Sequence, residues 1–362
     1  MIGMKTVLVL FGGVSSEHDV SLVSAKSVIE NIPKDKYNTI CAGITKDGRW
    51  LVYSGDVSKL PADIWLEDDA LLTPAMLSPD RGEKGLLLLT PAGIERVQVD
   101  VVFPVLHGKN GEDGTVQGLL ELAGIPFVGC GALSSAVCMD KAVTNALADA
   151  ADIAQARWRS ITKFEFKNSS KILLEDAADY LGFPIFVKPA NTGSSVGVSK
   201  AKNKMELFEA VESAFAFDDK VVLEEGIDGM EVECAVLGND EPLASVPGEV
   251  VPCNEFYDYD AKYVAGTSEL HIPARLPAEK LAEIRESACK VYRVLGCSGL
   301  ARIDYFVRHS DGAVLLNEPN TIPGFTSISM YPKMFAASGI AYPELLDKLI
   351  CLAIDKWSNV KK

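Results

Sequence analysis

Hydrophobic residues along the chain gather into short runs, several of which stop at glycine. Residues 5–11 are almost entirely apolar and end at Gly12-Gly13. Such a run is typical of a buried strand, and paired glycines favour a tight loop after it. Apolar residues then recur at helical spacing from Val20, and Ser15 or Ser16 is available to cap that helix. The opening therefore predicts a strand, a glycine loop and a helix, the first unit of an α/β fold.

Similar runs and turns continue to the end of the chain. Residues 54–98 are the least regular part, which we interpret as surface excursions or an edge hairpin. The pattern predicts further strands over 38–44, 99–106, 125–129, 183–188, 221–225, 231–237, 300–307 and 313–318. It predicts further helices over 115–123, 141–151, 204–215, 278–295 and 342–357.

The sequence pattern of the chain changes near residue 140 and again near residue 229. We therefore predict an N-terminal α/β domain over 1–139 with an open parallel sheet, and further domains over 140–229 and 230–362. The chain has 362 residues, and at about 150 residues per domain this length suits two or three domains.

The composition of the chain excludes one class of function. The chain is 48% hydrophobic and 23% charged, an ordinary globular mixture. Lys and Arg total 35 against 50 Asp and Glu, which gives a net charge of −15. A general nucleic-acid binder needs cations to neutralise phosphates, so we expect no nucleic-acid partner. A local basic pocket for a small phosphate ligand is compatible with this charge.

Cysteine spacing and hydropathy indicate the compartment. The eight cysteines form no CxxC pair, which favours free thiols in a reducing environment. The first apolar run reaches Gly12-Gly13 too soon for a signal peptide, and no segment approaches about 20 uninterrupted apolar residues. We therefore expect a cytoplasmic protein without a membrane partner.

Phosphate chemistry is suggested by a glycine–serine loop and two lysines. Residues 190–197 follow a predicted strand and contain two glycines and two serines, whose N–H groups would suit phosphate oxygens. The loop matches neither the Walker nor the dinucleotide pattern, and a flexible hairpin turn is an equal alternative. Lys188 ends the preceding strand and Lys141 lies on a predicted helix. Each is a candidate phosphate ligand, or simply a lysine that reaches solvent.

A metal site is suggested by two strands near the C-terminus. Alternation places Arg302 and Asp304 on one face of the first strand, and Glu318 and Asn320 on one face of the second. Hard oxygen ligands of this kind suit Mg²⁺ held together with nucleotide phosphates. The alternative is a half-exposed sheet edge with polar outer residues. Apolar flanks favour the metal, because buried carboxylates need a partner.

Four further polar residues lie at strand ends or at a predicted join. Glu17 and His107 follow predicted strands, and ligands of open α/β sheets bind at such carboxyl ends. Glu17 would suit a ligand's ammonium group, whereas a histidine there is often structural. Glu224 and Glu231 flank the second domain boundary. They would suit an adenine amino group and ribose hydroxyls, or they are solvated.

Taken together, these residues resemble the D-alanine–D-alanine ligases of the ATP-grasp superfamily. The resemblance spans essentially the whole chain and rests on residues 11–18, 106–108 with 111–114, 187–189, 193–197, 256–263, 301–304 and 320–326. It implies a three-domain ATP-grasp architecture. The implied activity is ATP-dependent joining of two D-alanines through a D-alanyl phosphate, for peptidoglycan precursor synthesis. The implied partners are D-alanine, ATP and a second copy of the chain in a homodimer.

The resemblance also implies where ATP and metal bind. ATP phosphates would contact Lys141 and Lys188, and Ser195 of the glycine–serine loop would belong to the same nucleotide site. Glu224 would accept the adenine amino group and Glu231 would bind the ribose. Two Mg²⁺ ions, with Mn²⁺ as an alternative, would bind three residues: Asp304, Glu318 and Asn320.

For the amino acids, the resemblance implies that Glu17 holds the first D-alanine's ammonium and that His107 orients this substrate. Arg302 and the Gly324 N–H would stabilise the tetrahedral oxyanion. Ser329 and Met330 would form the pocket for the second substrate's carboxylate. Two further implied residues lie on a mobile lid at about 250–275: Tyr263, hydrogen-bonded to Ser194 on closure, and Lys262, which would reach the transferred phosphate.

One motif bears on the choice of the second substrate. Lys262-Tyr263 resembles ligases that take D-alanine second, and relatives that make D-alanyl-D-lactate or D-alanyl-D-serine replace this motif. Such a ligase is the alternative function. A non-catalytic nucleotide-binding protein is disfavoured because Arg302 and the metal carboxylates are present.

Pro319 stands where the family usually has a branched aliphatic residue. The metal site survives if Glu318 and Asn320 keep their alternation, and a bulge there would weaken the second ion.

Overall fold

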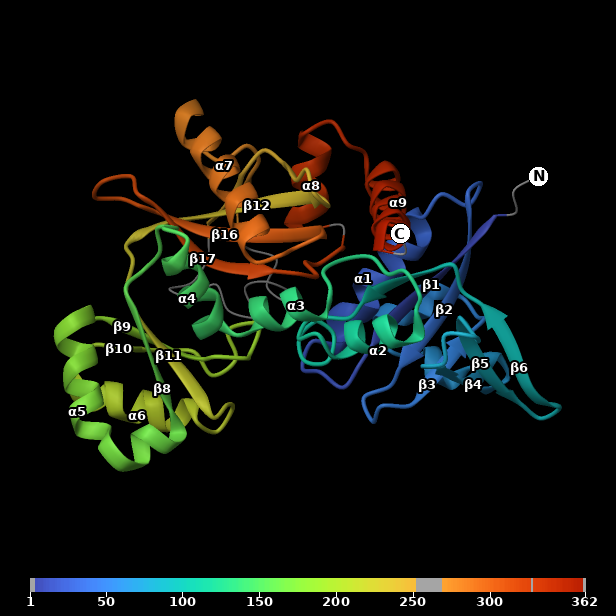
Figure 1. The fold of residues 1–362 in the computed structure, drawn as a ribbon, viewed down its shortest axis with the longest axis horizontal. Coiled ribbons are helices and arrows are strands. Elements are labelled where there is room, and N and C mark those ends of the chain that lie inside the picture. The colour runs from blue at the N-terminus through green and yellow to red at the C-terminus, as the bar shows by residue number, and fades with distance from the viewer. Residues whose placement is uncertain (1–3, 252–268, 327, 361–362) are drawn as a thin grey trace.

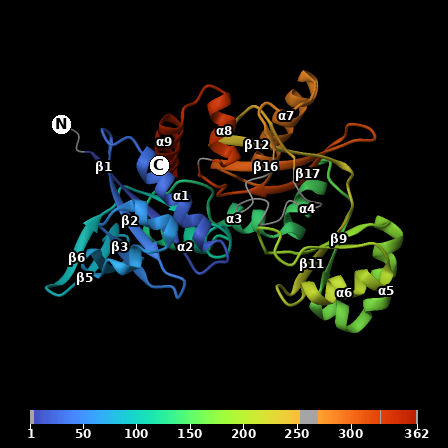
Figure 2. The same ribbon diagram turned by 180° about the vertical axis from the view of Figure 1, so that it is seen from behind.

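The structure, a computed structural model, describes residues 4–251, 269–326 and 328–360. Three β-sheets, each covered by helices, make up its frame (Figures 1 and 2). The first sheet contains β1 (Lys5–Gly12), β2 (Tyr37–Ile44), β3 (Trp50–Tyr53), β4 (Leu72–Leu77), β5 (Gly85–Thr90), β6 (Gly93–Gln98) and β7 (Val101–Val105). Its strand order is β6-β5-β4-β3-β2-β1-β7.

The first sheet is parallel only around β1. That strand pairs in parallel with β2 and β7, whereas β2 to β6 pair antiparallel in sequence order. In the described stretch from β2 to β6 no α-helix intervenes, whereas a parallel pair needs a crossover connection, usually an α-helix. The expected open parallel sheet is therefore mixed, and its antiparallel half comes from residues 50–98.

In three places the structure differs from, or adds to, what the sequence predicts. Residues 54–98 hold the expected hairpin as β5–β6, but also β4 and three 3-10 segments: η1 (Val57–Ala62), η2 (Trp65–Glu67) and η3 (Asp69–Leu71). The predicted strand over 125–129 is reduced to one bridge between Val102 and Phe127. The serine cap was wrong: Glu17 occupies the N-cap position without a side-chain cap, and Ser15 Oγ accepts the Glu17 N–H instead.

Alternation along β1 directs side chains to two separate cores. Val7 and Val9 pack with α1 (His18–Asn31) and α9 (Tyr342–Val360), whereas Leu8 and Leu10 pack with α2 (Thr115–Ala123). The last helix of the chain thus lies against the first sheet, beside α1 (Figure 1). The domain limits at 139/140 and 229/230 stay predictions.

The second sheet is antiparallel throughout, in the order β10-β9-β11-β8. Its elements are β8 (Trp158–Thr162), α5 (Lys163–Leu181), β9 (Ile185–Pro189), β10 (Ser199–Ala201), α6 (Lys204–Ala214) and β11 (Lys220–Glu225). Ile185, Val187 and Leu223 pack under α5 and α6 in one core. Alternation then turns Lys188 and Glu224 toward the opposite face.

The third sheet is likewise antiparallel, with one face packed against a helix. It contains β12 (Gly229–Gly238), β13 (Leu243–Ala244), β14 (Gly248–Val251), β15 (Glu269–His271), β16 (Gly299–Arg308) and β17 (Val314–Asn320). Its order is β15-β14-β12-β16-β17, with β13 paired to β12. Cys234 and Ile303 pack against α7 (Ala278–Val294). Glu233, Arg302 and Asp304 occupy the alternate positions of the same strands, so they belong to the other face.

Three more helices complete the described chain: α3 (Ala132–Met139), α4 (Lys141–Ala150) and α8 (Met330–Ala337). Helix α3 lies between the first and third sheets, where it contacts α2 and β17, whereas α4 contacts β8 and β11 of the second sheet (Figures 1 and 2). Within the described ranges, we find no helix that combines the length and the apolar character needed to cross a membrane.

Candidate active site

Two adjoining cavities contain the predicted site residues. The strand cavity, about 570 Å³, lies between the second and third sheets and is lined mainly by strand residues. The loop cavity, about 280 Å³, is lined mainly by residues that follow strands or precede helices. Lys141, Ser194 and Glu318 line both cavities. A ligand that filled one cavity would therefore lie beside a ligand in the other.

Lys188 and Glu224 form the centre of the strand cavity. Lys188 Nζ lies 2.6 Å from Glu224 Oε2 and 3.4 Å from the side-chain oxygen of Asn317. Loss of water lowers the pKa of Lys188, but Glu224 and the more distant Glu318 and Glu231 raise it, and the net shift is upward. Lys188 is therefore a fixed cation in a pocket with several carboxylates.

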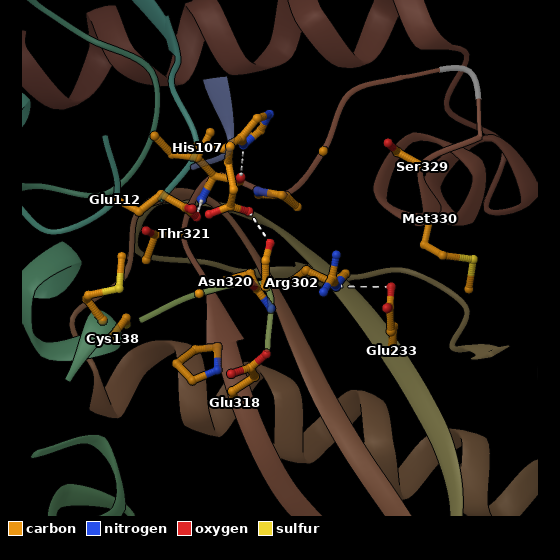
Figure 3. A pocket seen from close by; sticks show the side chains of 18 of the residues that line it. His107, Glu112, Cys138, Glu233, Arg302, Glu318, Asn320, Thr321, Ser329 and Met330 are labelled. Carbon is orange, nitrogen blue, oxygen red and sulfur yellow. Dashed lines mark hydrogen bonds and ion pairs between the residues drawn. The ribbon is translucent and has the colours of Figure 1, made fainter. Parts of the chain in front are cut away.

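The third sheet supplies a second charged group through its register. Asp304 is opposite Glu318, and Arg302 is opposite Asn320. The Arg302 guanidinium makes two hydrogen bonds to Asp304, of 2.7 and 2.6 Å, and its Nε lies 3.0 Å from Glu233. Figure 3 shows Arg302 pointing toward Glu233, with Asn320 and Glu318 nearby on β17. This fork fixes the guanidinium at the wall of the loop cavity.

The strand around Pro319 keeps the alternation that a metal site needs. Pro319 is buried, while Glu318 and Asn320 on either side are both partly exposed. A bulge does occur, but it lies two residues before Pro319: the partner of Tyr305 is Leu316, so Asn317 is the extra residue. Because β17 is the edge strand of its sheet, a residue without an N–H is tolerated there.

Asp304, Glu318 and Asn320 fit a divalent metal as a donor set. They lie on neighbouring strands and offer two carboxylates and one amide oxygen, the ligand types that Mg²⁺ prefers. Asn320 Nδ2 donates to Asp304 Oδ2 at 2.9 Å. Rotation of this amide by a half turn would present its oxygen to the same place. The structure thus brings together the three side chains that the sequence predicted as ligands.

The glycine–serine loop after β9 lies over both cavities. Ser194 and Ser195 have positive φ angles of 50° and 58°, and two turn hydrogen bonds close the loop. Lys141 Nζ donates to Thr192 O at 2.8 Å, so this lysine supports the loop from α4. Successive left-handed residues direct backbone N–H groups to one side, an arrangement suited to anions.

Glu17 connects this loop to the first sheet. Ser194 Oγ donates to Glu17 Oε1, although the two residues are 177 positions apart. Glu17 is buried, and the backbone packs closely around it. A Cβ added at Gly108 would lie 2.4 Å from Glu17 Oε2, and one at Gly193 would lie 3.1 Å from it. Both glycines therefore leave the room that the carboxylate occupies.

His107 is buried and has a defined tautomer. Its Nδ1 lies 3.0 Å from the Ile322 carbonyl oxygen, so Nδ1 carries the proton. Its Nε2 then accepts from Ser24 Oγ, also at 3.0 Å. Burial lowers the pKa of His107, against the opposing charge of Glu17, so the ring is neutral near pH 7. A neutral ring with both nitrogens engaged positions other groups and is not a proton donor.

Sequence reasoning missed Glu112, although residues 111–114 were among its motifs. Glu112 accepts the Gly108 N–H at 2.7 Å and the Ile322 N–H at 3.0 Å. Loss of water and the nearby Glu17 charge raise the pKa of Glu112 to about 8. The signal available in the sequence was a carboxylate among glycines after a strand. Glu233 and Asn317, described above, were missed as well.

The far end of the loop cavity is formed by the start of α8. Ser329 is the N-cap residue of this helix, and its Oγ accepts the Thr326 N–H at 3.0 Å. A Cβ at Gly324 would lie 2.8 Å from Ser329 Oγ. Figure 3 shows Ser329 and Met330 on the opposite side of the cavity from His107 and Glu112.

Every described residue that the sequence predicted for the site lines one of the two cavities. The loop cavity has Glu17, His107, Lys141, Ser194, Arg302, Glu318, Asn320, Gly324, Ser329 and Met330. The strand cavity has Lys141, Lys188, Ser194, Ser195, Glu224, Glu231, Asp304 and Glu318. The lid pair, Lys262 and Tyr263, lies outside the described residues.

Known proteins match this chain over most of its length. Residues 6–130 match the family model described as D-ala D-ala ligase N-terminus, and residues 147–351 match D-ala D-ala ligase C-terminus. A D-alanine–D-alanine ligase of Caldicellulosiruptor bescii is 51% identical over 350 residues, which are 97% of this chain and 95% of the relative. The chain belongs to the D-alanine–D-alanine ligase family. A second relative, from Acetivibrio thermocellus, is 50% identical over 98% of this chain and 97% of its own.

Solved structures show the same fold. The VanG D-Ala:D-Ser ligase of Enterococcus faecalis superimposes with a TM-score of 0.89 at 44% identity, over 97% of this chain and all of its own. The D-alanine–D-alanine ligase of Coxiella burnetii gives 0.88 at 36% identity, over 99% and 96%. This chain thus has the α/β ATP-grasp fold that the resemblance predicted, and family membership implies ATP and a divalent metal.

Proposed function

We propose that this chain joins two D-alanines to D-alanyl-D-alanine at the expense of ATP, for peptidoglycan precursor synthesis. The observation that carries the proposal is the pair of adjoining cavities with Lys141, Ser194 and Glu318 in their shared wall. One cavity has the cations and carboxylates that suit a nucleotide and its metal. The other offers a buried carboxylate and a guanidinium, which suit an amino acid.

The chemistry needs two steps because a free carboxylate does not form a peptide bond spontaneously in water. The γ-phosphoryl group of ATP is transferred to the carboxylate of the first D-alanine, which yields ADP and an acyl phosphate. The amine of the second D-alanine then attacks the carbonyl carbon, and phosphate leaves. Positioning and charge neutralisation are the main contributions of a protein to such steps.

At the nucleotide end, Lys141 and Lys188 neutralise phosphate charge, with Ser195 beside them on the loop. Glu231 binds the ribose. Glu224 accepts the adenine amino group while Lys188, 2.6 Å away, compensates its charge. Asp304, Glu318 and Asn320 would hold two Mg²⁺ or Mn²⁺ ions, which supply charge neutralisation at the transferred phosphate. Counting Mn²⁺ bound per chain with a non-hydrolysable ATP analogue, in wild type and Asn320→Ala, tests the second ion.

In the loop cavity, Glu17 binds the ammonium of the first D-alanine, and neutral His107 orients that substrate. Arg302 and the backbone N–H of Gly324 stabilise the oxyanion formed on amine attack. Ser329 and Met330 receive the carboxylate of the second D-alanine. Ser194, bonded to Glu17 here, would turn to Tyr263 when the lid closes, and Lys262 would then reach the transferred phosphate. We further propose a homodimer, testable by sedimentation, that acts in the cytoplasm, where ATP is available.

The decisive experiment measures phosphate release and product mass with ATP, Mg²⁺ and D-alanine, alone or with D-serine or D-lactate. We expect release that depends on D-alanine and a dipeptide of two alanines. Serine or lactate in the main product would replace the proposal by the alternative ligase, of which the D-Ala:D-Ser ligase VanG is an example. ATP binding without release would contradict ligation altogether.

A further inference from the structure

Both backbone polar groups of Ile322 are held by the loop that follows β7. Glu112 accepts the Ile322 N–H at 3.0 Å, and the protonated Nδ1 of His107 donates to the Ile322 carbonyl oxygen at 3.0 Å. These partners are 210 and 215 positions away in the sequence. Glu112 also accepts the Gly108 N–H at 2.7 Å, so its own loop fixes its carboxyl group.

Ile322 is central to the segment that carries the proposed oxyanion donor. Asn320, a proposed metal ligand, precedes it by two residues, and Gly324 follows by two. A third contact to the N-terminal part of the chain comes from Ser24 of α1, whose Oγ accepts the Phe325 N–H at 3.4 Å and donates to His107 Nε2. Any shift of Ile322 would therefore move the Gly324 N–H relative to Glu17.

We propose that Glu112 is a positioning residue for ligation, which aligns the Gly324 N–H with the first D-alanine by holding the Ile322 backbone. The inference rests on the proposed function of this cavity. A carboxylate is suited to the task because both of its oxygens accept hydrogen bonds. A glutamine presents one oxygen and one NH₂ group, so one of the two backbone N–H groups would face a donor.

The charges around Glu112 agree with this role. The charged groups that act on it are Glu17 and Arg302, and His107 of the same loop is neutral. The Glu17 charge is one reason why the pKa of Glu112 is raised to about 8. An ammonium group bound at Glu17 would offset that repulsion and favour the ionised Glu112, which holds both N–H groups. Binding of the first D-alanine would thus tighten the segment that the second step uses.

Misplacement of the Gly324 N–H would affect amine attack more than acyl phosphate formation. Water then competes with the amine: the acyl phosphate and water give back D-alanine and inorganic phosphate. Wild type should release one phosphate per dipeptide, whereas a positioning defect raises that ratio. A merely structural defect would lower the two products together and leave the ratio at one.

The test is Glu112→Gln, assayed for phosphate, dipeptide and the KM for ATP. We expect dipeptide turnover to fall at least about tenfold, less than the 10²–10³ typical of losing an oxyanion donor outright. The phosphate-to-dipeptide ratio should rise above one, and the KM for ATP should change less than about twofold. Glu121→Gln is the matched control, because Glu121 also accepts a backbone N–H, from Ala132 at 3.0 Å, but lies outside both cavities.

A ratio that stays at one in Glu112→Gln would overturn the proposal, whatever the fall in turnover. Should that variant fail to fold, Glu112→Asp decides by the same ratio, since it keeps two equivalent oxygens on a shorter side chain. A phosphate-to-dipeptide ratio above one in Glu112→Asp supports positioning, and a ratio of one at reduced turnover contradicts it. Failure of the proposed function would be distinct, because the wild type would then form no dipeptide.

Discussion

The strand cavity and the loop cavity are built from different parts of the fold. In the strand cavity, Lys188, Glu224 and Asp304 lie on strands whose other face packs under helices. Hydrogen-bonded ladders fix the backbone there, and alternation alone turns each side chain to the cavity. The position of each functional group follows from its own strand.

In the loop cavity, Glu17, His107 and Glu112 each depend on a partner far away in the chain. Glu17 is bonded to Ser194, and His107 and Glu112 hold Ile322. None of these residues lies within a strand. Contacts of this kind form only when the three sheets come together. The comparison indicates a preformed nucleotide site and an amino-acid site that depends on assembly of the whole fold.

The largest effect is expected in the strand cavity, from Glu318→Gln. The change removes one carboxylate from the proposed metal ligands and from the contact to Lys141, 3.6 Å away. Loss of a group that stabilises charge at the reacting phosphate typically costs 10²–10³ in rate, so we expect dipeptide turnover to fall by about 10³. The fold should persist because Glu318 is partly exposed on an edge strand.

Turnover of Glu318→Gln should be measured over a wide range of Mg²⁺, with thermal unfolding as the check on folding. Glu95→Gln is a matched control, because Glu95 is an exposed strand carboxylate of the first sheet. Turnover within about tenfold of wild type at saturating Mg²⁺ would remove Glu318 from the metal site.

The second-largest effect is expected in the loop cavity, from Glu17→Gln. A hydrogen bond to a charged group contributes about 1.5–3 kcal/mol, so the KM for the first D-alanine should rise about 10- to 100-fold. The KM for ATP should stay nearly constant, because Glu17 lines the loop cavity and not the strand cavity. Initial rates at varied D-alanine and varied ATP separate the two constants. Equal changes in both would erase the distinction between the cavities.

The difference between the two cavities also explains which site residues could be predicted from the sequence. Alternation and apolar flanks were enough to predict Arg302, Asp304, Glu318 and Asn320 as one group, and register in the third sheet confirms that they meet. The helix over 115–123 was predicted to the residue. Such local patterns report on strands and helices because their periods are fixed.

Long-range partners leave no such local pattern. The bonds from Ser194 to Glu17 and from Ile322 to Glu112 join residues 177 and 210 positions apart. Nothing in the residues around Glu112 alone predicts its second acceptor bond. The mixed first sheet was missed for a related reason: residues 50–98 pair by tertiary context, although their alternation is weak.

A smaller effect concerns pH and stability. The pKa of Glu112 is about 8 in the fold and near 4.5 when unfolded, so the folded chain keeps a proton that the unfolded chain loses between these values. The stabilising contribution is therefore complete below pH 4.5 and is lost as pH rises through about 8. We expect the unfolding temperature of the wild type to fall from about pH 6 to about pH 9 more steeply than that of Glu112→Gln. Parallel curves in thermal unfolding would contradict this raised pKa.

The smallest effect is expected from Pro319→Val, which restores the branched aliphatic residue usual in the family. Glu318 and Asn320 already alternate across a buried Pro319, and the bulge lies at Asn317 instead. The substitution should therefore leave turnover and its Mg²⁺ dependence within about twofold. A marked decrease in the Mg²⁺ needed for half-maximal turnover would show that the proline weakens the second ion. The preformed character of the strand cavity would then hold for the lysines and Glu224 but not for its metal ligands.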